Sequence, residues 1–158
     1  MHFPNGDLYN VMRYNIISGA PPYGLVLAYK VNDTDYDAPL EYSHSIKMPC
    51  NNSKFTIKYD DVSKKYYSIV TRIDCEERIG RRNLLSFMSS VDMENWELVC
   101  DLIDKRDLDI DKTGFQYVDF EFEGEDIIYL CRTAINNAHN FHDANYQTFH
   151  RIKNFRSI

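Results

Sequence analysis

Short stretches in which hydrophobic and polar residues alternate recur along the chain. Residues 54–59 and 116–122 alternate with a period of two, which is typical of a strand that has two different faces. Polar turn segments at 60–63 and 123–126 follow them and lead into second apolar runs, so each pair predicts a β-hairpin. No stretch convincingly places apolar residues at the helical spacing of i, i+3, i+4 and i+7. The pattern therefore predicts an all-β protein.

The same pattern repeats about every 60 residues. Apolar runs at 8–13, 67–72 and 127–132 each end in an arginine, and Arg13, Arg72 and Arg132 are 59 and 60 positions apart. We expect a further strand after each run, at 24–31, 83–90 and 144–152, and another at 41–48 and 96–103. Four antiparallel strands in each unit are typical of a β-propeller blade.

This repeat predicts a single partial propeller domain over residues 1–158. Its three units cover about residues 1–50, 51–111 and 112–158. The first unit lacks an innermost strand. Propellers typically close with 4–8 blades, so about three blades would remain open. We expect the chain to form a homo-oligomer or to be the remainder of a longer propeller chain. The alternative is one closed ten-stranded barrel, which gives no reason for the repeat.

Composition and charge narrow the classes of partner. The chain has 18 basic and 24 acidic residues, a net charge of −6, which argues against nucleic-acid binding. No apolar run approaches the ~20 residues that span a membrane, and the N-terminus lacks the pattern of a signal peptide. The chain as it stands is therefore expected to be cytoplasmic, or secreted if a parent chain carries a signal.

We expect neither a metal nor another cofactor. The four cysteines form no C-x-x-C pair, which indicates free thiols rather than a zinc site. His139, His142 and Asp143 offer ligand atoms, but their spacing is not a recognised zinc signature. Residues 136–150 are instead rich in side chains that can bind sugar hydroxyls, or that can satisfy their own backbone in a polar loop.

The three repeated arginines are the strongest candidates for ligand binding. At equivalent places in successive blades they would converge on one funnel, where guanidiniums bind a planar carboxylate well. The alternative is that each arginine pairs with a carboxylate of a neighbouring blade.

Several segments resemble a known family. Ser90, Asp92 and Trp96 resemble the Asp-box of sialidase-type repeats, whose role is to hold a hairpin. Residues 114–120, 126–134 and 142–152 resemble the C-terminal end of bacterial sialidase-like (BNR-repeat) glycoside-hydrolase-like propellers, and 53–57 resembles the opening of the preceding blade.

This resemblance implies an action on glycans. Sialidases bind the sugar carboxylate with an arginine triad and use a tyrosine nucleophile helped by a glutamate, with a separate aspartate as acid/base. Arg13, Arg72 and Arg132 are then the triad candidates. The catalytic candidates are Tyr146, Tyr117 and Asp143, and the supporting contacts are Lys54, Gln116, His142 and Asn145.

The expected function is that of a glycoside hydrolase, or the C-terminal portion of one, which binds an oligosaccharide or acidic sugar. The alternative is a carbohydrate-binding or interaction module without catalysis. A third alternative is a remnant that folds by self-association.

Overall fold

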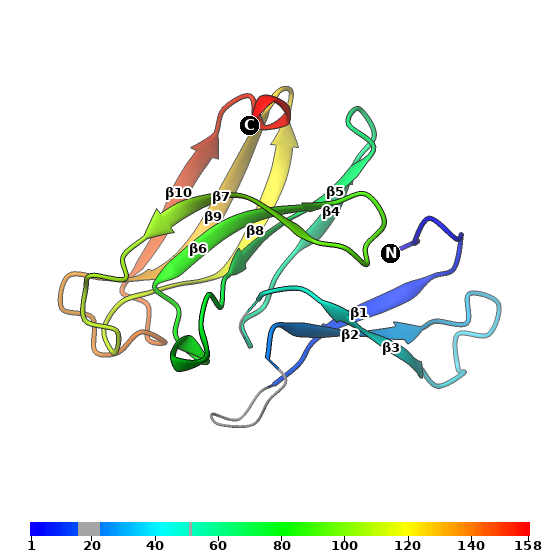
Figure 1. The fold of residues 1–158 in the computed structure, drawn as a ribbon, viewed down its shortest axis with the longest axis horizontal. Coiled ribbons are helices and arrows are strands. Elements are labelled where there is room, and N and C mark those ends of the chain that lie inside the picture. Colours follow the sequence, from blue (N-terminus) through cyan, green and yellow to red (C-terminus); the bar gives the residue numbers. More distant parts are fainter. Residues whose placement is uncertain (16–22, 51) are drawn as a thin grey trace.

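Three antiparallel sheets make up the described part of the chain (Figure 1). The computed structural model describes residues 1–15, 23–50 and 52–158. The first sheet has the order β1 (Tyr9–Arg13), β2 (Leu25–Lys30), β3 (Glu41–Lys47). The second has the order β4 (Ile57–Asp60), β5 (Lys65–Thr71), β6 (Leu84–Ser90), β7 (Glu97–Asp104). The third has the order β10 (Tyr146–Ile152), β9 (Asp126–Ala134), β8 (Gly114–Glu123). Two short 3-10 helices, η1 (Glu76–Arg78) and η2 (Phe155–Ser157), complete the elements.

The predicted all-β class is confirmed. Each sheet is built from strands that follow one another in the sequence and pair with antiparallel neighbours, and none of the three sheets closes on itself. The alternative of a single closed barrel is therefore wrong. Within residues 1–15, 23–50 and 52–158, no helix is long and apolar enough to cross a membrane.

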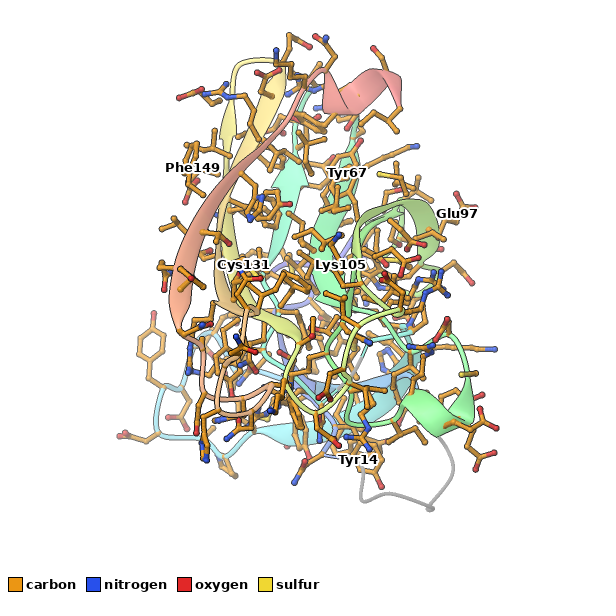
Figure 2. All side chains as sticks on the ribbon, turned by 90° about the vertical axis from the view of Figure 1, so that its left-hand side faces the viewer. Tyr14, Tyr67, Glu97, Lys105, Cys131 and Phe149 are labelled. Atoms are coloured by element: carbon orange, nitrogen blue, oxygen red, sulfur yellow. The ribbon has the colours of Figure 1, made fainter. Side chains whose placement is uncertain are left out.

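The second sheet is covered on both faces, because side chains of β5 and β6 alternate between two cores. The core shared with the first sheet includes Val26, Ala28, Ile46, Met48, Val70 and Met88. The core shared with the third sheet includes Ile69, Leu85, Phe87, Phe120, Ile127 and Cys131. Figure 2 shows Tyr67 and Cys131 in the interior and Phe149 on the outer side of β10. Strands buried on both faces carry near-continuous apolar runs, which explains the sequence of β5 and β6.

The hairpin between β6 and β7 is held by the side chains of Ser90 and Asp92. The Ser90 hydroxyl accepts hydrogen bonds from the backbone of Asp92 and Met93, at 3.3 and 2.9 Å. One Asp92 oxygen accepts from the backbone N–H groups of Glu94 and Asn95, at 2.9 and 2.8 Å. Trp96 donates from its ring nitrogen to the Met93 carbonyl at 3.0 Å and packs against the core between the first and second sheets. These residues perform the structural role expected of them.

The four cysteines are free thiols. Cys50 and Cys131 are buried, and burial raises the pKa of Cys50 to about 12 and that of Cys131 to about 11. Both therefore remain protonated at neutral pH and contribute to packing.

Candidate functional site

Tyr117 lies at an irregularity in β8. The register of β8 against β9 shifts between Gln116, which pairs with Arg132, and Asp119, which pairs with Leu130. Tyr117 falls inside this bulge with a φ of 55°, in the left-handed region, which costs a non-glycine residue about 1–3 kcal/mol. Bulges redirect side chains, and residues held in such conformations cluster at functional sites. The surroundings of Tyr117 are therefore the first place to look for a site.

Four cationic side chains gather around Tyr117. The guanidinium carbons of Arg132 and Arg82 lie 5.1 and 5.5 Å from the centre of its ring, and the Lys54 ammonium lies 5.7 Å away. Arg13 is the fourth, close enough to influence the ionisation of the phenol. Arg13 ends β1, Lys54 precedes β4, Arg82 precedes β6 and Arg132 belongs to β9. Positive charge from all three sheets thus converges on one aromatic ring.

The ionisation of Tyr117 responds to this charge. Burial raises the pKa of its phenol, but hydrogen bonding and positive charge from Arg82, followed by those from Arg13, outweigh burial and lower the pKa below its ordinary value. The site therefore favours negative charge at this position.

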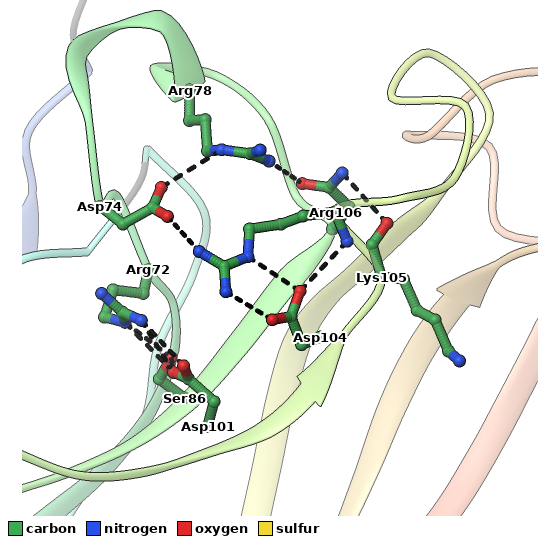
Figure 3. Close-up of polar contacts among 9 residues, drawn as sticks. Arg72, Asp74, Arg78, Ser86, Asp101, Asp104, Lys105 and Arg106 are labelled. Atoms are coloured by element: carbon green, nitrogen blue, oxygen red, sulfur yellow. Dashed lines mark hydrogen bonds and ion pairs between the residues drawn. The ribbon is translucent and has the colours of Figure 1, made fainter.

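The arginines of the chain divide into two groups. Six of the nine form ion pairs with carboxylates: Arg72, Arg78, Arg81, Arg106, Arg151 and Arg156. Figure 3 shows three of these: Arg72 against Asp101, Arg78 against Asp74, and Arg106 between Asp74 and Asp104.

The remaining three are Arg13, Arg82 and Arg132, and none of them forms an ion pair with a carboxylate in the described ranges. These are the three that meet at Tyr117.

Arg82 is the most unusual member of the group. It is 7% exposed, and its Nε and Nη1 atoms are buried without a hydrogen-bond partner among the described residues. The fully buried Gln116 also has its Oε1 atom without a partner there. Because buried polar atoms are almost always hydrogen-bonded, these atoms mark a place where a water molecule or a ligand completes the hydrogen bonds. The guanidinium of Arg82 also lies 5.7 Å from the ring of Phe141, so it contacts two aromatic rings.

His142 approaches Tyr117 from the connection between β9 and β10. Its Nε2 atom lies 3.2 Å from the Tyr117 hydroxyl, and the two rings meet edge to face with centres 6.1 Å apart. Behind it, Nδ1 lies 3.6 Å from a carboxylate oxygen of Asp143. The pKa of Asp143 is lowered by hydrogen bonds from His139 and Asn140 and by His142, so this carboxylate is ionised at neutral pH. His142 thus lies between a phenol and a carboxylate.

The backbone of this connection is held by residues of the sheet. Gln116 donates from Nε2 to the carbonyls of Phe141 and His142 at 3.2 and 2.9 Å, and Arg132 donates to the His142 carbonyl at 3.2 Å. The connection also passes very close to Gly114, where a Cβ would lie 2.4 Å from the Phe141 carbonyl oxygen. A glycine at position 114 is therefore required for His142 to reach Tyr117.

Most of the sequence-predicted site residues lie together here. Tyr117 is at the centre. Five other predicted residues contact or surround it: Arg13, Lys54, Gln116, Arg132 and His142. Asp143 lies one step behind His142.

Three other candidates are placed differently. Arg72 donates to both oxygens of Asp101, at 3.0 and 2.9 Å from Nη2, and to the Ser86 hydroxyl, so it could bind a ligand only after breaking this pair. Asn145 exchanges hydrogen bonds with the backbone of Ile135 and closes the base of the loop. Tyr146 is half exposed at the start of β10.

Arg82 was not predicted from the sequence. Arg81 and Arg82 are adjacent, and only the fold separates them: Arg81 pairs with Asp111, whereas Arg82 is buried over the ring of Tyr117. The available signal was a basic pair directly before a buried strand, which does not show which member points inward.

A cleft of about 410 Å³ adjoins the cationic group. It is lined by Val11, Met12, Arg13, Lys54 and Phe55. This volume is within the usual range for a small-molecule site. Arg13 and Lys54 therefore belong both to the cleft wall and to the surroundings of Tyr117. In the described ranges, no group of three or more His, Cys, Asp or Glu side chains could hold a metal ion.

Comparisons of the chain with protein-family models, curated proteins and solved structures found no match. Function is therefore argued from the site itself.

Proposed function

We propose that the chain is part of a sialidase-like propeller that acts on glycans and binds an acidic sugar through its carboxylate at Tyr117. Arg13, Arg82 and Arg132 bind the carboxylate, and Lys54 adds a fourth positive charge. Tyr117 is the catalytic tyrosine of this proposal.

One observation carries the proposal: the three arginines without an ion-paired carboxylate are the three that converge on Tyr117. Like charges brought together without a counter-ion repel one another, and the burial of Arg82 adds a desolvation cost. A bound anion removes both costs, so the cluster is an incomplete site that a ligand carboxylate completes.

The surrounding groups favour a sugar acid over a simple inorganic anion. The planar guanidinium forks match a carboxylate, and the half-exposed His142 offers ring nitrogens suited to sugar hydroxyls. The cleft beside Arg13 provides room for the remainder of the ligand. A hydrolase of this kind would also need a second carboxyl-type group, which another part of the assembly would supply.

The propeller assignment is supported by the stacked sheets and by the apolar outer face of the third sheet. Leu130 and Phe149 are 46% and 61% exposed there, next to a hollow of about 180 Å³ lined mainly by apolar side chains. Such a face is what a blade presents where another blade of the same kind normally covers it.

The test is binding of N-acetylneuraminate and glucuronate, each compared with its methyl ester, by isothermal titration calorimetry. The ester keeps the sugar and loses the charge, so we expect the acid alone to bind. Hydrogen bonds to charged groups contribute about 1.5–3 kcal/mol, so Arg13→Gln should weaken binding by roughly 10- to 100-fold. Arg151→Gln, which removes a positive charge from a surface ion pair, is the matched control.

Equal binding of acid and ester, or no binding of either, would contradict the proposal. Binding of the acid without cleavage of its aryl glycoside would favour a non-catalytic carbohydrate-binding module. That alternative is favoured by one observation: no carboxylate of the described residues is hydrogen-bonded to the Tyr117 hydroxyl.

A further inference from the structure

We propose that His142, oriented by Asp143, is the proton acceptor that activates the hydroxyl of Tyr117. The proposal deepens the proposed function and rests on it for the identity of the substrate, while the proton transfer itself is a property of the free protein. It also departs from the sialidase resemblance, which implies a glutamate as the partner of the tyrosine.

The first step of the argument is the contact between the two side chains. The Tyr117 hydroxyl and His142 Nε2 are 3.2 Å apart, which is within hydrogen-bonding distance. The carbonyl of His142 is fixed by Gln116 and Arg132, and Gly114 allows the loop to lie close to β8. The imidazole is therefore held against the phenol by contacts on its own backbone.

The second step is the direction of the hydrogen bond. A carboxylate oxygen of Asp143 lies 3.6 Å from the Nδ1 atom of His142, and its negative charge favours a proton on that nitrogen. In neutral imidazole the other nitrogen, Nε2, then carries the lone pair. In this tautomer the phenol donates to Nε2, which is the arrangement that proton transfer requires.

The third step is the fate of the charges. When the O–H bond of Tyr117 breaks and an N–H bond forms at Nε2, phenol becomes phenolate and imidazole becomes imidazolium. The charged groups that face Tyr117 are Arg13, Lys54, Arg82 and Arg132, all of them cationic. They stabilise the phenolate, and Asp143 stabilises the imidazolium.

The test measures the nucleophilicity of Tyr117 without any sugar. An aryl sulfonyl fluoride labels a phenol oxygen: an O–S bond forms, fluoride leaves, and the phenol proton goes to the base. Labelling at each tyrosine is followed by mass spectrometry between pH 5 and pH 10. Tyr36, which is 90% exposed, is the internal reference for an ordinary tyrosine.

We expect Tyr117 to react faster than Tyr36 at neutral pH. His142→Gln keeps a hydrogen-bonding side chain that cannot take up a proton, and general-base catalysis usually contributes about 10²- to 10⁴-fold, so labelling of Tyr117 should slow by about 100-fold. The half-maximal pH of labelling should also move upward. His44→Gln, on β3 and paired with Glu94 rather than with any group of this site, should leave the labelling unchanged.

The proposal is overturned if Tyr117 reacts no faster than Tyr36, or if His142→Gln leaves its rate and pH profile unchanged. A second measurement needs no variant: nitrogen NMR of the native protein should show neutral His142 protonated at Nδ1, and protonation at Nε2 would also overturn it. Failure of sugar binding with an activated Tyr117 would contradict the proposed substrate alone.

Discussion

Replacing Arg82 with methionine tests whether the cationic cluster exists for binding rather than for stability. Arg82 is 7% exposed and has two nitrogens without a partner among the described residues. Each unsatisfied buried donor costs about 1–3 kcal/mol, so the two together cost about 2–6 kcal/mol. Methionine keeps an unbranched apolar stem of similar length and removes both donors.

The interactions that methionine would lose are of similar size, because they include the hydrogen bond from Arg82 to the Tyr117 hydroxyl, which contributes about 1.5–3 kcal/mol, as well as two cation–π contacts. Arg82 lies 5.5 and 5.7 Å from the ring centres of Tyr117 and Phe141, and cation–π contacts contribute about 0.5–2 kcal/mol each. The variant also loses repulsion between Arg82 and the neighbouring cations. The balance predicts that Arg82→Met changes the free energy of unfolding by less than about 1 kcal/mol while it abolishes binding of the sugar acid.

The assay is urea denaturation followed by the fluorescence of Trp96, the only tryptophan of the chain. Trp96 is partly buried and packs against the core between the first and second sheets. Arg151→Met, which breaks a surface ion pair, is the control and should change stability only slightly. A decrease of more than about 1 kcal/mol in Arg82→Met would refute the reasoning, because it would show that the guanidinium is satisfied and holds the fold together.

Two further predictions concern the groups that shape the fold and the site. The pKa of Asp92 is lowered to about 2, and the hydrogen bonds from Asn95 are the largest cause. A carboxyl whose pKa is lower in the folded than in the unfolded protein stabilises the folded state at pH values above the unfolded pKa. Asp92→Asn should therefore lower the free energy of unfolding at pH 7 by roughly 1–2 kcal/mol after solvent screening. This difference should shrink as the pH falls below about 4 towards 2 in urea titrations, and a difference independent of pH would contradict it. Gly114→Ala should push the Phe141 backbone away and separate His142 from Tyr117, so the labelling rate of Tyr117 should fall to that of Tyr36. Circular dichroism should show that the strand content of the variant is unchanged. Unchanged labelling would show that the loop does not need this close approach.

The strands could be predicted from the sequence because their physical cause is local. Alternation with a period of two follows from side chains pointing to opposite faces, and it placed strands near Ile57 and Phe120. Turn residues after each run marked the hairpins, and Ser90 and Asp92 marked a third turn whose hydrogen bonds lie within a few residues of each other. Interactions over such short separations depend little on the rest of the chain.

The candidate site was only partly predictable. The repeat brought Arg13 and Arg132 to attention, and both lie at Tyr117. It also included Arg72, whose position in the repeat is equivalent but whose guanidinium meets Asp101 across its own sheet. Equivalent positions share a backbone environment, whereas the partner of a long side chain depends on which carboxylates the neighbouring strands happen to present.

The sequence by itself determined where the strands form, how they group into three units and that the chain has no excess of positive charge for nucleic acid. The tertiary structure alone decided which arginines remain without a carboxylate, that Arg82 is buried beside Tyr117, and that His142 lies against the phenol. The physical reason is that periodicity and turn chemistry act over a few residues, whereas burial and charge pairing depend on segments from all three sheets that meet only after folding.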